Sequence, residues 1–275
     1  MPAVVFSKGA STLAAPFSLW LLVLSLLFST LPQTAHASAC PATSSSERVR
    51  VVHVYDGDTV KLGDGRRLRI IGINTPELGK GDATTEPLAN EARALLQELL
   101  DTNNRTLLLQ YDAQHKDHYG RLLAHAFTES GDNVASILLQ GGLATTLVVP
   151  PNTWGMDCYQ RLENDARIDR RGLWQLPSYQ SRPVRELSPD TRGYRIVQGR
   201  VSDVHESKHT VWIELDGPLT LQISRKDLPN FGSLDSLAGT DVEVRGWIRQ
   251  VEGGLRMSLQ HPAALTVITA EPARH

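Results

Sequence analysis

The chain has 275 residues, of which 41% are hydrophobic, and its 28 Lys and Arg residues nearly balance 30 Asp and Glu residues. This length is enough for one large domain or two small ones. The formal net charge of −2 excludes a protein that packages nucleic acid through a net basic surface. Any polyanion that this chain binds must therefore be held by a local cluster of basic side chains.

The chain opens with a segment typical of export signals. Lys8 is the only charged side chain before Glu47, and residues 17–31 form an apolar run. This run is shorter than the roughly 20 apolar residues that a membrane span needs. The sequence Ala-His-Ala at 35–37 fits a cleavage site. We predict a signal peptide over residues 1–37 and a periplasmic or secreted mature protein without stable membrane association. An uncleaved membrane anchor is the alternative.

The two cysteines, Cys40 and Cys158, both lie in the predicted mature chain. In an exported protein an isolated pair favours a disulfide over a metal site, so we expect them to pair. Lipidation of Cys40 is a weaker alternative, because residues 37–39 lack the large aliphatic side chain usual before a lipidated cysteine. No C-x-x-C or H-E-x-x-H spacing occurs, and zinc is therefore not expected.

Three strands are predicted in the first part of the mature chain. Residues 48–55 largely alternate apolar and polar side chains, which predicts a half-buried strand. A second strand begins at Thr59. The sequence Gly-Asp-Gly at 63–65 predicts a hairpin turn into a third strand over residues 66–72. Residues 79–86 have no periodicity and are predicted as a loop.

Helices are predicted over residues 89–101, 133–140 and 157–171, from apolar periodicity and from the glycines that follow the last two. Two more strands, over residues 106–111 and 121–127, lie between the first two helices. Five strands and three helices in this order favour a small Greek-key barrel of the oligonucleotide-binding (OB) kind.

The second half of the chain has a different pattern. Residues 177–191 are rich in Pro and Ser and are predicted to be a linker. Residues 192–270 then contain five strand-like segments, which predicts a second, C-terminal OB-like β-barrel. The expected fold class is therefore a β-barrel with helices (α+β), followed by a second barrel. Tyr194, Trp212 and Trp247 are either a stacking platform for single strands or core residues.

Three motifs of the first half together make one chemical set. They are Asp-Gly-Asp-Thr at 56–59, Arg-Ile-Ile-Gly-Ile-Asn-Thr-Pro-Glu at 69–77 and Asp-His-Tyr-Gly-Arg at 117–121. The set offers carboxylates for a hard metal ion, two arginines for a phosphate and a glutamate for a water, as metal-assisted phosphodiester cleavage needs. In order and spacing the motifs resemble the staphylococcal-nuclease-like (thermonuclease) family over residues 48–176.

This resemblance implies a metal site for Ca²⁺, with other divalent cations as alternatives. Its ligands would be Asp58, Asn74 and the backbone carbonyl of Thr75, while Asp56 would hold the turn and bound waters around them. Asp58 and Asn74 have a plainer alternative as turn-capping residues. The family has an aspartate where Asn74 stands, so this site carries one formal negative charge fewer.

The resemblance also implies that Arg69, Glu77 and Arg121 are catalytic. The arginines would bind phosphate oxygens as charge builds on them, and Glu77 would orient or deprotonate the attacking water. Arg69, beside aliphatic residues, has the alternative of snorkelling to the surface. His118 and Tyr119 are expected as substrate contacts, with a solvated loop as the equal alternative.

The expected function is an exported, metal-dependent nuclease that cleaves phosphodiester bonds of DNA and RNA without sugar specificity. It would act as a monomeric endonuclease and leave 3′-phosphate products. Residues 144–151 lack the tyrosines that stack on bases in the family, which leaves base preference open. The alternatives are a nuclease-fold nucleic-acid-binding module without catalysis and an envelope assembly or adhesion factor. Because both arginines and Glu77 are present, the sequence favours the enzyme.

Overall fold

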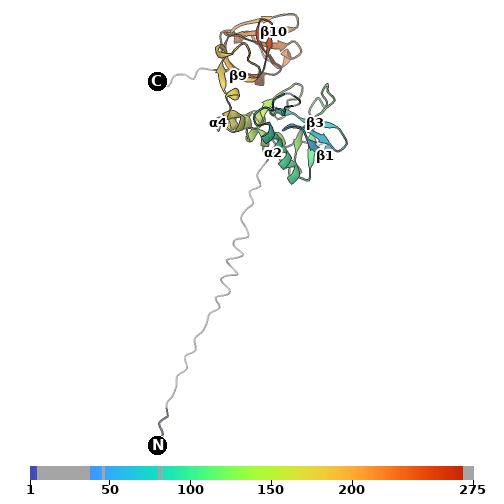
Figure 1. The fold of residues 1–275 in the computed structure, drawn as a ribbon, viewed down its shortest axis with the longest axis vertical. Coiled ribbons are helices and arrows are strands. Elements are labelled where there is room, and N and C mark those ends of the chain that lie inside the picture. Colours follow the sequence, from blue (N-terminus) through green and yellow to red (C-terminus); the bar gives the residue numbers. More distant parts are fainter. Residues whose placement is uncertain (5–37, 45–46, 80, 82, 269–275) are drawn as a thin grey trace. The chain divides into compact units, whose positions relative to one another are not determined.

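In the computed structural model, short alternating segments of the first half form five strands that close into a barrel (Figure 1). Their bounds are Glu47–Val54 (β1), Thr59–Leu62 (β2), Arg67–Ile70 (β3), Thr106–Gln110 (β5) and Leu122–Phe127 (β6). The order around the barrel is β1-β2-β3-β6-β5. β3 and β6 run parallel, and the other neighbours are antiparallel. This arrangement confirms the predicted barrel.

The structure describes residues 1–4, 38–44, 47–79, 81 and 83–268. Most of the predicted signal peptide, residues 5–37, lies outside this described part. None of the helices within the described part is long and apolar enough to cross a membrane. Residues 1–37 and Ser38–His275 are separate units, and both barrels belong to the second one.

The core of the first barrel follows from the alternation of apolar side chains along its strands. Val51 on β1, Leu68 on β3 and Leu109 on β5 are completely buried. Along β1 the pairing with β2 shifts between Val51 and His53, where a bulge interrupts the register. Burial of apolar surface, worth about 25 cal/mol per Å², is the main contribution that holds these strands together.

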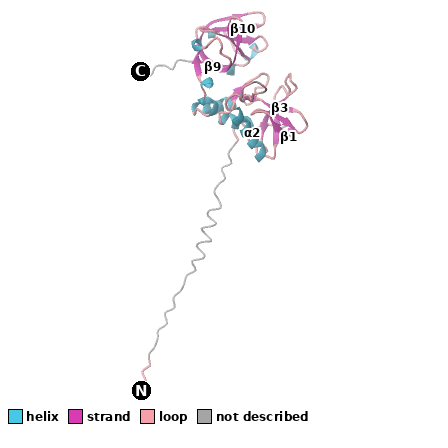
Figure 2. Cartoon of the chain, in the orientation of Figure 1, coloured by secondary structure: helices cyan, strands magenta, loops and turns pink. Residues whose placement is uncertain are grey.

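The described chain has three α-helices, and helices are drawn in cyan in Figure 2. Side chains of all three α-helices belong to the core of the first barrel. The helices are α2 (Ala89–Thr102), α3 (Val134–Gln140) and α4 (Met156–Ile168). The residues of α2 that face the core, Ala92, Leu96 and Leu100, are four apart and so share one side of the helix. α3 begins where the side chain of Asn133 accepts a hydrogen bond from the backbone N–H of Ser136 (3.1 Å).

A separate two-stranded sheet pairs β4 (Gly72–Asn74) with β7 (Thr145–Leu147). The sequence predicted one strand over residues 66–72, but β3 ends at Ile70. Gly72 has φ of 86°, and a Cβ there would lie 2.4 Å from Cε2 of Tyr159 on α4. The tyrosine ring thus leaves room only for glycine where the chain turns out of the barrel. The new strand places Asn74 opposite Thr145.

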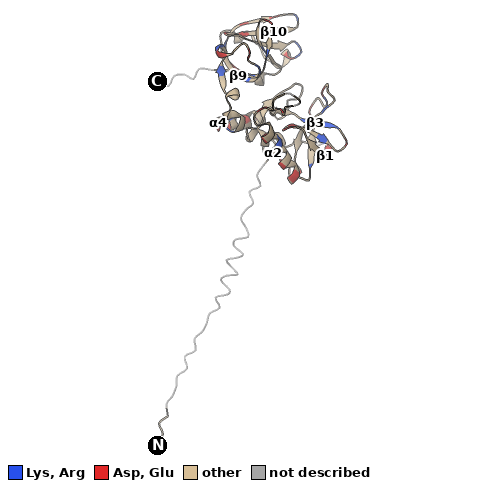
Figure 3. Ribbon diagram, in the orientation of Figure 1, with Lys and Arg blue, Asp and Glu red and all other residues tan. Residues whose placement is uncertain are grey.

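The second half forms the predicted second barrel. Its strands are β9 (Gly193–Glu206), β10 (Thr210–Leu215), β11 (Leu219–Ser224), β12 (Asp241–Val251) and β13 (Gly254–Leu259). They pair in the order β9-β10-β11-β13-β12, and pairing of β12 with β9 closes the ring. Two short 3₁₀ helices, η4 (Leu228–Asn230) and η5 (Asp235–Leu237), lie between β11 and β12. Acidic and basic residues occur in both barrels (Figure 3).

The segment expected as a linker is ordered and belongs largely to the second barrel. It forms η2 (Pro177–Tyr179), β8 (Ser181–Pro183) and η3 (Val184–Glu186). β8 pairs in parallel with β9. Val184 and Leu187 are buried in the core of the second barrel. These two apolar side chains, set among Pro and Ser, are the physical reason why the segment does not behave as a linker.

Ion pairs join α4 of the first barrel to β12 of the second. Arg245 pairs with the carboxylate of Glu163, whose side chain is 3% exposed. Arg167 makes two hydrogen bonds to Glu243, of 2.7 and 2.9 Å. The second oxygen of Glu163 accepts a hydrogen bond from the backbone N–H of Thr146 on β7 (2.8 Å). A buried charge that loses its partner costs about 3–5 kcal/mol, so these contacts hold the two barrels in place.

The predicted disulfide between Cys40 and Cys158 is confirmed, with a Cα–Cα distance of 5.8 Å. The bond links the segment around Cys40 to helix α4, which carries Cys158. Asn133 adds a hydrogen bond from Nδ2 to the carbonyl oxygen of Cys40 (2.9 Å). The segment around Cys40 is therefore anchored to the first barrel both covalently and by hydrogen bonding.

Candidate active site

Asp56 and Asp58 lie in the turn between β1 and β2, which packs against helix α2. The backbone N–H of Asp58 donates to Oδ1 of Asp56 (3.1 Å), which fixes the turn. A Cβ at Gly57 would lie 2.7 Å from Cγ2 of Thr75 and 2.8 Å from Cβ of Ala92. Glycine is therefore required here, because the turn packs directly against the segment that carries Thr75.

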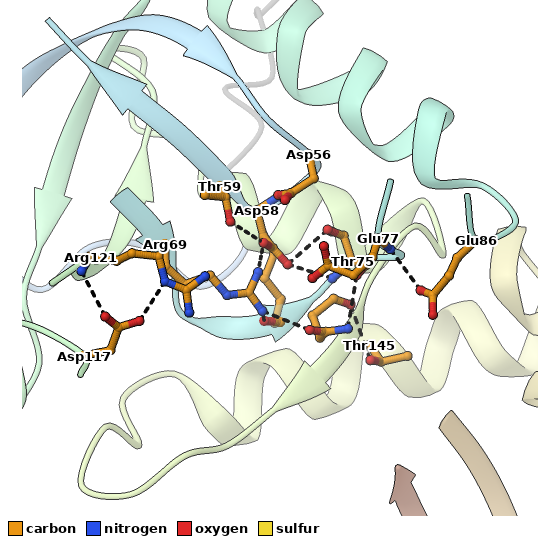
Figure 4. A network of polar contacts seen from close by, with 12 residues as sticks. Asp56, Asp58, Thr59, Arg69, Thr75, Glu77, Glu86, Asp117, Arg121 and Thr145 are labelled. Atoms are coloured by element: carbon orange, nitrogen blue, oxygen red, sulfur yellow. Dashed lines mark hydrogen bonds and ion pairs between the residues drawn. The ribbon is translucent and has the colours of Figure 1, made fainter. Parts of the chain in front are cut away.

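Asp58 is the centre of a buried polar network, and only 1% of its surface is exposed. Its Oδ2 accepts hydrogen bonds from the backbone N–H of Thr75 (2.8 Å) and from the hydroxyl of Thr75 (3.0 Å). Its Oδ1 accepts a hydrogen bond from the hydroxyl of Thr59 (3.0 Å) and forms an ion pair with Arg69 (Figure 4). The carboxylate is thus buried, and both of its oxygens contact donor groups.

Arg69 on β3 is the cation of this network, and its side chain is 12% exposed. Its Nη2 donates to Oδ1 of Asn74 (2.9 Å) and to the carbonyl oxygen of Ile73 (3.2 Å). Burial lowers the pKa of Arg69 to about 10, while the nearby carboxylates of Asp56 and Glu77 oppose that shift. The guanidinium therefore stays charged at neutral pH, and it lies inside the site instead of snorkelling to the surface.

Asn74 bridges Arg69 and Thr75. While its Oδ1 accepts from Arg69, its Nδ2 donates to the carbonyl oxygen of Thr75 (3.1 Å). An aspartate at this position has no N–H and cannot make the second bond. The side-chain amide of Asn74 thus donates its hydrogen bond to the carbonyl oxygen of Thr75, the atom that the family resemblance assigns to the metal ion.

The three predicted metal ligands, Asp58, Asn74 and Thr75, do lie next to one another. Their donors are oxygens only, which fits a hard divalent cation by ligand type. They supply a single carboxylate, and no group of three or more His, Cys, Asp or Glu side chains within the described residues is suited to hold a metal. The guanidinium of Arg69 also neutralises Asp58. An ion bound to these oxygens would therefore have to displace Arg69 and the amide of Asn74.

Glu77 lies beyond Pro76, at the start of a loop that is closed by two hydrogen bonds. Its backbone N–H donates to Oε2 of Glu86 (2.9 Å), and the backbone N–H of Glu86 donates to the carbonyl oxygen of Glu77 (2.9 Å). The residue is exposed, and its charge acts on Arg69. Glu77 is thus exposed, and its backbone is hydrogen-bonded to the side chain of Glu86 (Figure 4).

Arg121 is positioned by Asp117, a residue to which the sequence assigned no role. Nε of Arg121 donates to Oδ2 of Asp117 (2.7 Å), and the backbone N–H groups of Arg121 and Tyr119 both donate to Oδ1 (2.9 Å each). Burial raises the pKa of Asp117, but these hydrogen bonds hold it below its usual range. The only sequence signal for this role was the turn pattern Asp-x-x-Gly in the third motif.

His118 and Tyr119 lie at the tip of the same turn. Their rings are 3.7 Å apart between centroids, and Cζ of Arg121 lies 5.6 Å from the centroid of the Tyr119 ring. Tyr119 is 74% exposed. His115 stacks instead on Tyr111, at 4.7 Å. Tyr119 and His118 are therefore accessible to a ligand beside Arg121.

A cavity of about 510 Å³ opens beside these residues. Arg69, Asp117, His118 and Arg121 are among its polar lining residues, and apolar side chains including Leu123 line it as well. A lining that combines arginines with apolar groups fits a phosphate with an attached base or sugar. The cavity therefore joins the two arginines in one cleft, although 52 residues separate them in the sequence.

Comparisons with known proteins agree with the motifs. A model of the family described as Staphylococcal nuclease homologue matches residues 67–176. Endonuclease YncB of Bacillus subtilis is 30% identical over 155 residues, which cover 54% of this chain and 72% of that protein.

Two thermonucleases are also similar to this chain. That of Staphylococcus hyicus is 30% identical over 157 residues, or 56% of this chain and 90% of that protein. That of Staphylococcus intermedius is 32% identical over 144 residues, or 49% of this chain and 83% of that protein. These relatives correspond to about half of the chain and to most of their own length.

Proposed function

We infer, because the chain belongs to the family of staphylococcal nuclease homologues, that it is a metal-dependent endonuclease that hydrolyses phosphodiester bonds in DNA and RNA without sugar specificity. The observation that carries this proposal is that Arg69 and Arg121 line one cleft, and that Arg69 is paired with the buried carboxylate of Asp58. A module that only binds nucleic acid has no need for a buried carboxylate network behind its phosphate-binding arginines.

In this proposal the arginines position the scissile phosphate. Asp117 orients Arg121 so that its terminal nitrogens are available for two non-bridging oxygens, whose charge grows as the bond breaks. Arg69 approaches the same phosphate from the inner side of the cleft. Glu77 orients the attacking water and accepts its proton. Water attacks phosphorus in line with the 5′ oxygen, which leaves, and the product keeps a 3′ phosphate.

Asp58, Asn74 and the carbonyl of Thr75 would hold a hard divalent cation, for which we propose Ca²⁺. When bound, the ion would supply further positive charge to the phosphate oxygens. Release of Arg69 from Asp58 would at the same time turn the guanidinium toward the substrate. These ligands act through oxygen atoms alone, which favours Ca²⁺, Mg²⁺ or Mn²⁺ over softer metals.

A plasmid assay tests this function. The mature protein is incubated with supercoiled DNA or with RNA, with Ca²⁺ or with a chelator, and the product ends are labelled. We expect Ca²⁺-dependent cleavage of both nucleic acids and 3′-phosphate ends. Binding without cleavage under any divalent cation would instead support the binding module, and 5′-phosphate ends would reject the proposed polarity.

We also propose that the protein is exported and acts in the periplasm or outside the cell. In support, Cys40, the third residue after the predicted cleavage site, forms a disulfide, and structural disulfides persist in oxidising compartments. Fractionation of cells followed by intact-mass measurement checks this. A mature protein beginning at Ser38 outside the cytoplasm is expected, and a cytoplasmic full-length chain would contradict it.

Replacing Asn74 by aspartate is expected to strengthen metal binding without abolishing activity. The change adds a charge at the ion and removes the donor that occupies the carbonyl of Thr75. One unit charge a few ångströms away is worth more than the ~1.4 kcal/mol that a tenfold change requires. We therefore expect half-maximal cleavage at about tenfold lower Ca²⁺ concentration, and a larger rise in melting temperature on adding Ca²⁺.

Asn164→Asp is the matched control, since Asn164 is exposed on α4 and the substitution introduces the same charge outside the site. Its calcium titration should overlap that of the unmodified protein. If the Asn74→Asp titration overlaps as well, in both cleavage and melting, then Asn74 is not a ligand.

A further inference from the structure

The cleft beside Arg121 has a wall that comes from the second barrel. Besides the residues of the three motifs, Lys226, Asp227 and Gln260 line the same cavity. Lys226 and Asp227 follow strand β11, and Gln260 follows β13. The ion pairs of Glu163 and Arg167 with β12 fix this barrel against the first one. The site is thus incomplete without residues beyond the region that matches the nuclease family.

The turn that carries Lys226 is rigidly built. The backbone N–H of Asp227 donates to the carbonyl oxygen of Ser224 (2.9 Å), and the hydroxyl of Ser224 donates to Oδ2 of Asp227 (2.6 Å). Nδ2 of Asn230 donates to the carbonyl oxygen of Gln260 (3.2 Å), which ties the turn to the end of β13. Lys226 is therefore held at the cleft by its backbone.

Lys226 also keeps its charge available. Its neighbour Arg225 pairs with Glu206 (2.6 Å), and Asp227 is engaged by Ser224. Lys226 itself is exposed and makes no ion pair with any residue in the described part of the chain. An unpaired lysine in a cleft that already holds two arginines raises the positive potential there, which favours a phosphate ligand.

A second hollow of about 110 Å³ shares Leu147 and Gln260 with the cleft. Tyr194 and Trp247 from β9 and β12 line it. Trp247 is 39% exposed and packs edge-to-face on Tyr194, with ring centroids 5.1 Å apart. The cleft and this hollow therefore form one groove, hereafter the barrel groove, that leads from the arginines to an exposed indole.

Of the three aromatic residues that the sequence singled out in this barrel, only Trp247 suits stacking on a ligand. Tyr194 supports it from below, and Trp212 is covered by Arg256, whose Cζ lies 4.6 Å from the ring centroid. Trp212 does not line the barrel groove. The groove thus offers one lysine and one aromatic face in succession, the two groups that hold the backbone and a base of a single strand.

We propose that the barrel groove binds the single-stranded nucleic acid that leaves the cleavage site. Lys226 binds a phosphate neighbouring the scissile one, and Trp247 stacks on a base further along. This assignment rests on the proposed nuclease function and names its preferred substrate class, a single strand longer than the cleft. A base in a duplex is stacked on both faces and cannot use the indole, so duplex substrate gains less from this groove.

The test compares single-stranded oligonucleotides of about 3 and about 12 nucleotides as cleavage substrates, the longer one within the range of roughly 4–16 nucleotides bound by OB barrels. The variants are Lys226→Ala and Trp247→Ala, with Lys208→Ala as control because Lys208 is exposed on the same barrel but does not line the groove. Trp247→Phe keeps an aromatic face. Circular dichroism and melting temperature establish that each variant is folded.

For the long strand we expect KM to rise about tenfold in Trp247→Ala and several-fold in Lys226→Ala, with kcat nearly unchanged. Trp247→Phe should recover most of the loss. In Lys226→Ala the slope of log KM against log salt should fall by about 0.7, the contribution of one phosphate contact to a single strand. KM of Trp247→Ala for the short strand, which does not reach the indole, and all constants of Lys208→Ala should stay within twofold of the unmodified protein.

The outcomes separate this inference from the proposed function. If the unmodified protein cleaves and the variants match it on the long strand, the barrel groove is not a binding site, although the nuclease function stands. Equal losses on duplex and single strand would overturn the assignment to single strands. If the unmodified protein cleaves nothing, the nuclease proposal fails. Binding of the long strand, measured by fluorescence anisotropy, then tests the barrel groove separately. Weaker binding by Lys226→Ala and Trp247→Ala would support the groove as a binding site, and unchanged binding would reject it.

Discussion

Replacing Arg121 by alanine is expected to lower kcat on DNA on the order of 10³-fold, the largest effect of any single substitution in this protein. The guanidinium is held by Asp117 through Nε, and it lines the same cleft as Arg69. Its bonds to the phosphate strengthen as charge builds in the transition state, so their loss falls on kcat more than on KM. Initial rates at saturating substrate measure this effect.

Two further variants give the prediction its controls. Arg48→Ala removes an arginine of the same barrel whose side chain is 68% exposed and paired with Glu129, and it should leave kcat within about twofold. Asp117→Asn keeps one acceptor for Arg121 but removes the charge, and it should give an intermediate loss. An Arg121→Ala protein that is folded and cleaves within threefold of the unmodified rate would show that Arg121 does not touch the scissile phosphate.

Removal of the disulfide, as Cys40→Ala with Cys158→Ala, is expected to lower the free energy of unfolding by about 4–5 kcal/mol in the chain-entropy model. The two cysteines are 118 residues apart in the sequence, so their bond restricts a long loop of the unfolded chain. Urea unfolding of the mature protein at equilibrium measures the difference. A loss of this size is a large part of the 5–15 kcal/mol that stabilises a typical domain.

Reduction of the unmodified protein provides the control, because it opens the same loop without changing any residue and should reproduce most of the loss. Replacing both cysteines avoids leaving a single thiol that can pair between molecules. Unfolding curves that coincide for the oxidised protein and the double variant would mean that the bond adds nothing to stability. Hydrogen bonds such as that between Asn133 and Cys40 would then be enough to hold the segment.

The first barrel could be predicted from local signals in the sequence, and the proximity of Asp58, Asn74 and Thr75 from the family resemblance, whereas the ion pair of Asp58 with Arg69 was not predicted. Turn residues and strand alternation predicted the strands, and the resemblance of the three motifs to the family implied that Asp58, Asn74 and Thr75 lie together. The break between β3 and β4 could not be predicted in the same way. It depends on Tyr159, which lies far along the chain and packs against Gly72.

Contacts between distant segments account for the other differences. The segment 177–191 has the composition of a linker, yet Val184 and Leu187 find apolar partners in the second barrel. Lys226 carries no motif, and only the docking of the second barrel brings it to the cleft. The hydrogen bond from Asn74 to the carbonyl of Thr75 likewise depends on side-chain geometry that spacing alone does not encode.

Glu163 has a consequence for the cooperativity of the whole protein. One of its oxygens holds Arg245 of the second barrel, and the other holds the backbone of Thr146, next to the residue that pairs with Asn74. Separation of the barrels would therefore leave the buried charge of Glu163 without Arg245, and would loosen strand β7 behind Asn74 in the same event. This strand and the contacts of the second barrel then open together as one cooperative unit, a foldon. Amide exchange at Thr146 reports on both the local opening and the detachment of the second barrel.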